Sequence, residues 1–334
     1  MTRRALGIAA CAAALVCAQS EARAADDVVR IIVGGIEKQI YLPAALADRL
    51  GYFREQGLTV QLLSESSGVN AEDELLSGSV HGVVGFYDHT IDLQAKGKFV
   101  QGVVQFSQAP GEVEIVAAKV ADSIRSPADL KGRRLGVTGM GSSTHLLTQY
   151  IVVSHGVRTS DVAIVPVGSG AAFANAMRQG RIDAGMTTEP TASSLLRSGE
   201  GVMLVDLRTP QSTAKVLGGV YPGACLYMTT LWINTHRSTV QRLVNALVKA
   251  LRYIDTHDAN EIAAVLPSEL AGIDRAQYVA ALGASKSMFT MDGRMPPSGP
   301  EAVLRILKTV NHAVQMKPID LARTYTNDFV SSAH

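Results

Sequence analysis

The feature that most constrains this chain is a regular alternation of short apolar runs with segments of helical pattern. In the first half the apolar runs are 28–33, 58–63, 80–86 and 99–106. Between them lie expected helices at 42–50, 71–77 and 89–95, with Asn70 as the expected N-cap of the second. Short strands separated by helices are typical of parallel β-α-β units. The alternation therefore predicts an α/β fold.

The same rhythm restarts after residue 112. Its expected strands are 113–118, 134–138, 162–167, 182–187, 202–206 and 224–233. Ser126, Pro127 and Asp129 form a helix-start signal, with a hydroxyl cap, a proline and a carboxylate in the first turn. Two longer helices are expected at 143–155 and 239–254. The repetition predicts a second unit of similar β/α design.

The N-terminal segment has the three-part layout of a secretory signal. Basic residues at 3–4 precede an apolar run at 5–17, and Ala22 and Ala24 supply the small residues that signal peptidase requires. We expect cleavage of residues 1–24 and a mature protein in the periplasm. Lipid attachment at a cysteine of this segment is the alternative.

Charge and cysteine content exclude several classes of protein. Cleavage removes three arginines and one glutamate, which changes the formal net charge from +1 to −1. No basic excess remains for nucleic acid or an anionic membrane surface. Cys225 stands alone in the mature chain, so no intramolecular disulfide is expected. The mature chain has no second apolar run long enough to cross a membrane.

Several short motifs occur in a characteristic order. They are residues 51–58 (GYFREQGL), 129–132 (DLKG), 139–143 (GMGSS), 182–184 (IDA) and 188–190 (TEP). Their order and spacing resemble the periplasmic substrate-binding proteins of the nitrate, sulfonate and taurine type, which share a fold with thiamine-precursor-binding proteins. The resemblance covers most of the mature chain up to about residue 255.

This resemblance implies a two-lobed, type II periplasmic-binding-protein fold. Each lobe would be a mostly parallel sheet flanked by helices, with the ligand cleft between lobes. Lobe one would comprise 25–112 and 225–334, and lobe two 113–224. The family delivers a small-molecule ligand to a membrane permease and its ATPase subunits. We expect a monomer without a cofactor, a metal or a nucleic-acid partner.

The loop that opens the helix at 143–155 is the first candidate for ligand binding. Its candidate residues are Gly141, Ser142, Ser143 and Thr144. A helix N-terminus presents unpaired N–H donors and partial positive charge, which suits a sulfonate or carboxylate. Glycine permits close approach of the backbone, and the hydroxyls add donors. Ordinary capping of the helix is the alternative reading.

Loops that follow strands supply the other candidates, because ligands bind beyond the carboxyl ends of strands in open α/β sheets. In lobe one they are Lys38, Gln39, Tyr41, Tyr87, Asp88 and His89; in lobe two they are Thr188 and Glu189, with Tyr221 near a lobe crossing. Tyrosine offers a ring and a hydroxyl. Asp88 is an alternative helix cap, and Glu189 is a candidate partner for an ammonium group.

No recognisable catalytic motif or metal-ligand spacing occurs in the chain. We therefore expect a receptor and not an enzyme. The candidate loops lack arginine, so an anion would depend on N–H groups, hydroxyls, Lys38 or His89. The expected ligand is a small organic anion or zwitterion: a sulfonate, a taurine-like compound, or an aromatic carboxylate or sulfonate. A sensor subunit and a periplasmic hydrolase are the alternatives.

Overall fold

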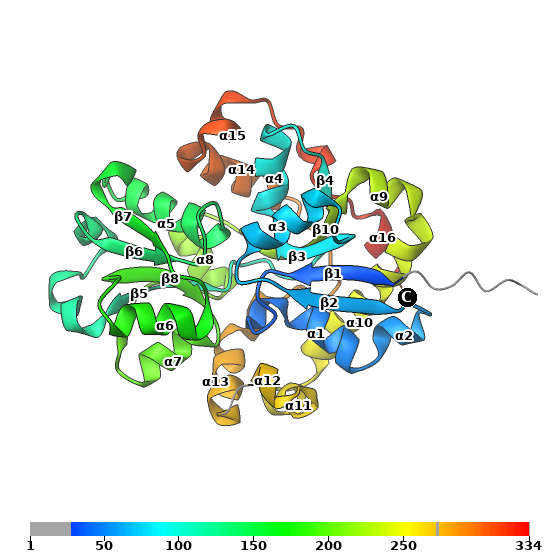
Figure 1. Ribbon diagram of the computed structural model, residues 1–334, viewed down its shortest axis with the longest axis horizontal. Coiled ribbons are helices and arrows are strands. Elements are labelled where there is room, and N and C mark those ends of the chain that lie inside the picture. Colours follow the sequence, from blue (N-terminus) through cyan, green and yellow to red (C-terminus); the bar gives the residue numbers. More distant parts are fainter. Residues whose placement is uncertain (1–27, 272–273, 334) are drawn as a thin grey trace, which may run out of the picture.

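The computed structural model describes residues 28–271 and 274–333, and the predicted signal peptide lies outside them. Two five-stranded sheets lie side by side, each flanked by helices (Figure 1). The first sheet has the order β2 (Val60–Ser64), β1 (Val29–Val33), β3 (Gly82–Phe86), β10 (Ala224–Thr229), β4 (Val100–Gln105). The second has the order β7 (Ala163–Pro166), β6 (Arg134–Val137), β8 (Ala184–Thr188), β5 (Glu112–Ala117), β9 (Gly201–Leu207).

The two sheets share one topology. In the first, β1 pairs in parallel with β2 and β3, whereas β10 is antiparallel to β3 and β4. In the second, β6 pairs in parallel with β7 and β8, whereas β5 is antiparallel to β8 and β9. The antiparallel strand is each time the first one after the chain crosses between sheets. The chain enters each sheet at the carboxyl ends of the parallel strands, so the entering strand runs in the opposite direction to them.

The helices expected at 42–50, 71–77, 89–95, 143–155 and 239–254 form with small shifts in their bounds, whereas the strand expected at 224–233 ends at Thr229 and a helix follows it. Those before the first crossing are α1 (Leu42–Arg49), α2 (Tyr52–Glu55), α3 (Gly68–Ser77) and α4 (Asp88–Ala95). Those of the second sheet are α5 (Ser143–Ser154), α6 (Gly170–Arg178), α7 (Thr191–Arg197) and α8 (Pro210–Leu217). The remainder are α9 (Thr230–Thr235), α10 (Arg237–Thr256), α11 (Ala259–Val265), α12 (Ser268–Ala271), α13 (Arg275–Ser285), α14 (Gly299–Val310), α15 (His312–Met316) and α16 (Asp328–Ser331).

One predicted cap is wrong. Helix α3 begins at Gly68, and its N-cap is Ser67, whose hydroxyl accepts a hydrogen bond from the N–H of Asn70 at 3.3 Å. Asn70 therefore lies in the first turn as a donor and not at the cap. A serine hydroxyl satisfies a free N–H of the first turn as well as an asparagine does. The chain thus enters the helix almost one turn earlier than expected.

Apolar packing joins the two halves as well as filling each. Leu147 and Ile151 of α5 share a buried cluster with Val303 and Leu307 of α14, which belongs to the first sheet's half. The two helices come from different halves and both lie in the upper part of the view in Figure 1. Burial of apolar surface is the main favourable term in folding and association, so this contact stabilises the closed arrangement. Within residues 28–271 and 274–333, no helix has the length and apolar character needed to span a membrane.

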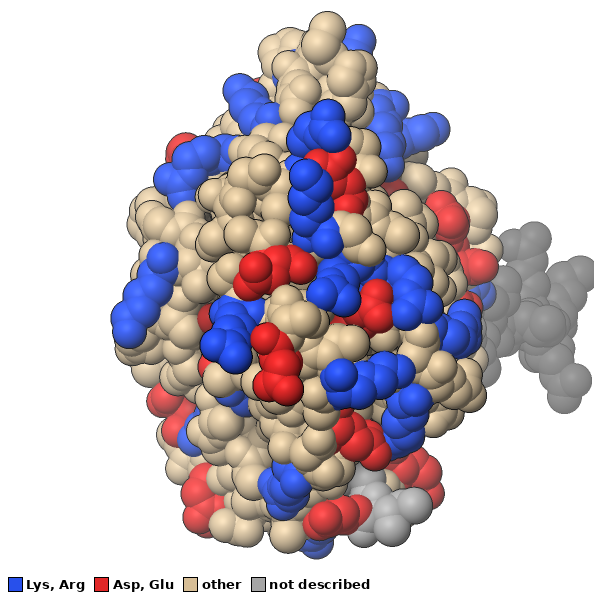
Figure 2. Space-filling view, turned by 90° about the vertical axis from the view of Figure 1, so that its left-hand side faces the viewer, with Lys and Arg blue, Asp and Glu red and all other residues tan. Residues whose placement is uncertain are grey.

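The exposed end of the second half carries no charge patch of one sign. Lys and Arg side chains are interspersed with Asp and Glu over this face (Figure 2). Mixed surface charge agrees with the nearly neutral composition. This face provides no electrostatic footprint for a polyanion.

Candidate functional site

A small cavity lies between the two sheets. Its walls are Lys38, Tyr41, Gly68, Phe86 and His89 from the first half and Glu112, Thr138, Ser142, Ser143, Thr144 and Thr188 from the second. Its volume is about 10 Å³. That is room for about one water molecule. The two halves are therefore closed on each other at this point.

Strand ends position these walls. Phe86 is the last residue of β3 and Thr188 the last of β8, and Thr138 directly follows β6. The carboxyl ends of the parallel strands in both sheets thus point into the same cavity, as expected for open α/β sheets. Seven of the candidate residues from the sequence line the cavity: Lys38, Tyr41, His89, Ser142, Ser143, Thr144 and Thr188.

Two buried carboxyl groups dominate the chemistry of this region. Asp88 is fully buried and its Oδ2 accepts a hydrogen bond from the Tyr221 hydroxyl at 2.9 Å. Burial raises the pKa of Asp88. Burial also raises the pKa of Glu112 well above its usual value, and the negative charge of Asp88 raises it further. The nearby Ser143 hydroxyl lowers both pKa values in part. Among the described residues, nothing forms a well-aligned hydrogen bond with Asp88 Oδ1 or Glu112 Oε2.

Sequence reasoning missed Glu112. It is the first residue of the antiparallel strand β5 and lies in register with Thr188 at the end of β8. The sequence pattern points to loops beyond strand ends, whereas an antiparallel strand brings its start to that same edge. A signal was present, because Glu112 and Glu114 alternate with apolar residues in the run EVEIVA. Acidic side chains at the buried positions of a strand are rare and need a reason.

The two basic side chains at the cavity, Lys38 and His89, lie next to acceptor oxygens. Lys38 is 5% exposed, and its Nζ donates a hydrogen bond to the carbonyl oxygen of Gly34. Burial lowers the pKa of Lys38, and the negative charges of Glu37 and Glu112 partly raise it again. His89 Nδ1 lies 3.5 Å from Glu72 Oε2, and Nε2 lies 3.8 Å from Asp88 Oδ1.

Hydroxyls of the glycine-containing loop mostly bond within the loop. Ser142 Oγ donates to the carbonyl of Gly139 at 2.7 Å, and Thr144 Oγ1 accepts from the N–H of Thr138 at 3.0 Å. The N–H of Gly141 donates to His145 Nδ1 at 2.9 Å, and Gly141 is not a wall residue. Its φ of +87° explains the glycine, since other residues rarely adopt that conformation. Ser143 is therefore the hydroxyl of this loop that remains directed at the two carboxyl groups.

Tyr87 and Gln39 are buried but are not wall residues of the cavity. The Tyr87 hydroxyl forms a hydrogen bond with Thr324 Oγ1 at 2.5 Å, inside the core of the first half. Gln39 Nε2 donates to the carbonyl of Tyr278 at 2.9 Å. Its backbone N–H donates to the carbonyl of Glu189 at 3.0 Å and so links the two halves. These side chains shape the region around the cavity without facing it.

Glu189 has its own partners. Its carboxylate accepts hydrogen bonds from the backbone N–H and the hydroxyl of Ser193, and it forms an ion pair of 2.8 Å with Arg208. Arg208 also pairs with Asp206 at 2.8 Å. An ammonium group of a ligand would have to compete with this arginine. Tyr221, expected near a crossing, is fully buried and reaches the site through its bond to Asp88.

Comparison with known proteins identifies relatives over most of the chain. Residues 40–260 match the family described as NMT1/THI5 like. The 4-amino-5-hydroxymethyl-2-methylpyrimidine phosphate synthase THI13 of Saccharomyces cerevisiae is 26% identical over 227 residues, which are 64% of this chain and 63% of the yeast protein. The chain thus spans less than two thirds of the length of that curated relative.

Solved structures extend the similarity to nearly the whole molecule. A protein from Bordetella bronchiseptica RB50 is 35% identical with a TM-score of 0.87, over 91% of this chain and 96% of that one. The alkanesulfonate-binding protein SsuA from Xanthomonas axonopodis pv. citri, bound to MOPS, is 18% identical with a TM-score of 0.73, over 90% and 98% of the two chains. The expected resemblance is confirmed: the chain belongs to the NMT1/THI5-like family and has the periplasmic-binding-protein fold.

Proposed function

We propose that this protein is an exported receptor that captures one small solute between its two halves and delivers it to an ABC permease and its ATPase subunits. The observation that carries the proposal is the set of buried polar atoms at the closed cavity. Glu112 Oε2 from one half and His89 Nε2 from the other line the cavity and make no hydrogen bond among the described residues, although His89 Nε2 lies 3.8 Å from Asp88 Oδ1. Buried polar groups are normally paired, so their missing partner is the solute.

Capture requires the halves to part. Ligand pockets usually measure about 300–1,000 Å³, whereas this cavity measures about 10 Å³. Opening breaks the bond between Gln39 and Glu189 and the 2.7 Å hydrogen bond from Ser169 to Glu37. Rotation about the crossing segments, residues 106–111 and 218–223, would admit the solute, and closure would require contacts to both halves at once.

The chemistry of the cavity favours a solute that carries a nitrogen donor. Glu112 lines the cavity and Asp88 is buried next to it, and in the ionised form both would repel a simple anion such as nitrate. A protonated amine or an amino-substituted ring would satisfy them and hold both in the ionised form. An anionic end would lie near Lys38 and the first turn of α5. Among the expected ligands, a taurine-like zwitterion therefore suits the site better than a plain alkanesulfonate or aromatic carboxylate.

An aminopyrimidine is a further candidate solute. The yeast relatives are named for an aminopyrimidine phosphate, which bears the same kind of donor group. Those names also raise synthesis as the alternative function. The two functions predict different results: a receptor releases its solute unchanged, whereas an enzyme converts it into a product.

A ligand panel tests the proposal. The purified protein is incubated with taurine, alkanesulfonates, aromatic carboxylates, nitrate and aminopyrimidines, and its melting temperature is followed. A ligand at 100 times its dissociation constant adds about 2.7 kcal/mol of apparent stability. We expect stoichiometric, reversible binding of an amine-bearing solute, and mass spectrometry of the recovered compound should show no change. Chemical conversion by the pure protein would replace the receptor with an enzyme.

A further inference from the structure

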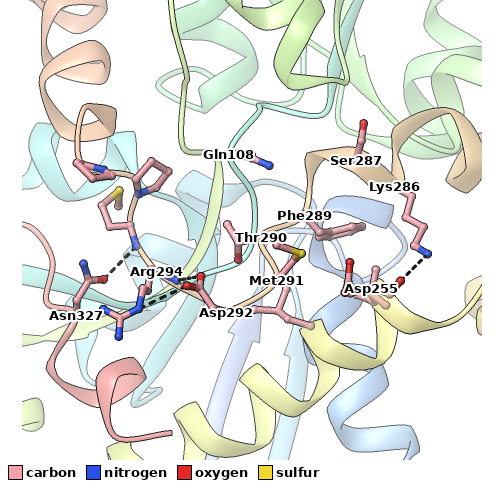
Figure 3. A pocket seen from close by; sticks show the side chains of 15 residues that line it. Gln108, Asp255, Lys286, Ser287, Phe289, Thr290, Met291, Asp292, Arg294 and Asn327 are labelled. Atoms are coloured by element: carbon pink, nitrogen blue, oxygen red, sulfur yellow. Dashed lines mark hydrogen bonds and ion pairs between the residues drawn. The ribbon is translucent and has the colours of Figure 1, made fainter.

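A second and much larger cavity lies in the first half, beside the first crossing segment. Its volume is about 780 Å³, within the usual range for ligand pockets. It is formed by the end of α10, the segment 286–297 and Gln108 of the first crossing (Figure 3). None of its wall residues lines the cavity between the sheets.

The cavity has an apolar middle and polar ends. Phe289 and Met295 are buried in its wall, and Met291 is 65% exposed. In Figure 3, Lys286 and Asp255 lie at one end, while Arg294 and Asp292 lie at the other. This layout suits an elongated molecule whose body is apolar and whose end is polar.

The Lys286 ammonium and the Arg294 guanidinium differ in how many of their N–H donors are already used. Lys286 Nζ donates hydrogen bonds to the backbone carbonyls of Asp255 and His257. Arg294 is half exposed, and its Nε lies 3.5 Å from Asp292 Oδ2, a contact too long for a strong ion pair. The remaining guanidinium donors are therefore available for the two oxygens of an anionic group.

One wall residue of this cavity, Gln108, belongs to the first crossing segment, residues 106–111. The N–H of Gln108 donates to the carbonyl of Met288 at 2.8 Å, and its carbonyl accepts from the N–H of Tyr221 at 3.3 Å. The first crossing is thus held between the segment 286–297 and the second crossing. Any molecule in the cavity would contact the segment about which the halves rotate.

We propose that this cavity is a second binding site, for a small amphipathic molecule with an apolar or aromatic body and an anionic group. The body lies against Phe289 and Met291, and the anionic group pairs with Arg294. The site is separate from the solute cavity and stays accessible when the halves are closed.

The fluorescent probe 1-anilinonaphthalene-8-sulfonate, which is aromatic and anionic, tests the proposal on the folded protein. We expect it to bind with one-to-one stoichiometry. Met291→Glu, which places a charge on the apolar wall, should weaken binding at least tenfold, and Arg294→Gln about threefold or more. Met316→Glu is the matched control, because Met316 is 67% exposed and lies on α15 outside the cavity. Unchanged melting temperatures show that the variants are folded.

A disulfide across the closed interface separates this site from the solute cavity. A Cβ added at Gly139 would lie 3.2 Å from Ser67 Cβ, so a small outward shift would bring the pair to the roughly 3.5–4.5 Å spacing of disulfides. Oxidised Ser67→Cys/Gly139→Cys should bind the probe like wild type. Loss of probe binding in the oxidised protein, equal binding by the Met291→Glu and Met316→Glu variants, or no binding to wild type would each overturn the second site. The last two outcomes leave the solute site unaffected.

Discussion

Asp88, at the start of α4, and Glu112, at the start of β5, are two buried acids from opposite halves: burial raises the pKa of Glu112 well above its usual value, and the charge of Asp88 raises it further. Both side chains are buried, and each keeps one oxygen without a well-aligned partner in the described structure. Two acids brought together by closure are unfavourable when both are ionised. A cationic or N–H-bearing solute between them would make closure favourable, because it would neutralise or hydrogen-bond both carboxylates.

Glu112→Gln should weaken binding of an amine-bearing solute about tenfold or more, because a hydrogen bond to a charged group contributes about 1.5–3 kcal/mol. Glu114→Gln is the matched control, since Glu114 is equally buried on the same strand but does not line the cavity. Isothermal titration calorimetry with the solute found in the panel measures both. Tighter binding by Glu112→Gln would show that the solute is an anion.

Ser143→Ala should weaken solute binding by about 0.5–1.5 kcal/mol, the usual contribution of one hydrogen bond, without changing the melting temperature of the free protein. Its hydroxyl faces both carboxyl groups and lines the cavity. Ser154→Ala at the other end of α5 is the control, because its hydroxyl bonds only to neighbours on that helix turn. Equal affinity of both variants for the solute would remove Ser143 from the site.

Tyr87→Phe should leave solute affinity unchanged and lower the free energy of unfolding by about 1 kcal/mol. The substitution removes the bond to Thr324, whose hydroxyl keeps its bond to the carbonyl of Leu321 at 2.7 Å. Urea unfolding measures the stability. A variant with normal stability but weakened solute binding would place Tyr87 at the solute after all.

The oxidised disulfide variant of Ser67 and Gly139 should neither take up nor release solute, because the closed cavity is too small to exchange it. Reduction should restore binding. In small-angle scattering, wild type should become more compact when solute is added, whereas the oxidised variant should show no change. Normal solute exchange by the oxidised protein would mean that capture does not require opening.

Glu114 predicts a specific pH dependence. Burial raises its pKa to about 8, against a small opposing effect of the Thr148 hydroxyl. The folded state therefore keeps a proton that the unfolded state loses above its ordinary value of 4.5. The contribution of Glu114 to the free energy of unfolding should fall as the pH rises from about 4.5 to 8 and then level off. Glu114→Gln should flatten this slope in urea titrations at several pH values; parallel curves would contradict the assignment.

The order of elements and the paired β/α design could be read from the sequence. Apolar runs, glycine stops and proline starts are local signals, and local backbone preferences follow from them directly. Four candidate residues, Tyr41, His89, Ser143 and Thr188, line the cavity because they lie at or beyond strand ends that tertiary packing turns toward one point. The family resemblance had the same basis in short local motifs.

Only the tertiary structure decided which of those side chains face the cavity. Glu189 lies in an expected loop, yet Arg208 pairs with it, and Tyr87 turns into the core to Thr324. Glu112 enters the site because β5 runs antiparallel, which depends on where the chain crosses and not on the residues of the strand. Pairing of charges and direction of strands are set by contacts between segments far apart in the sequence, and no local pattern encodes them.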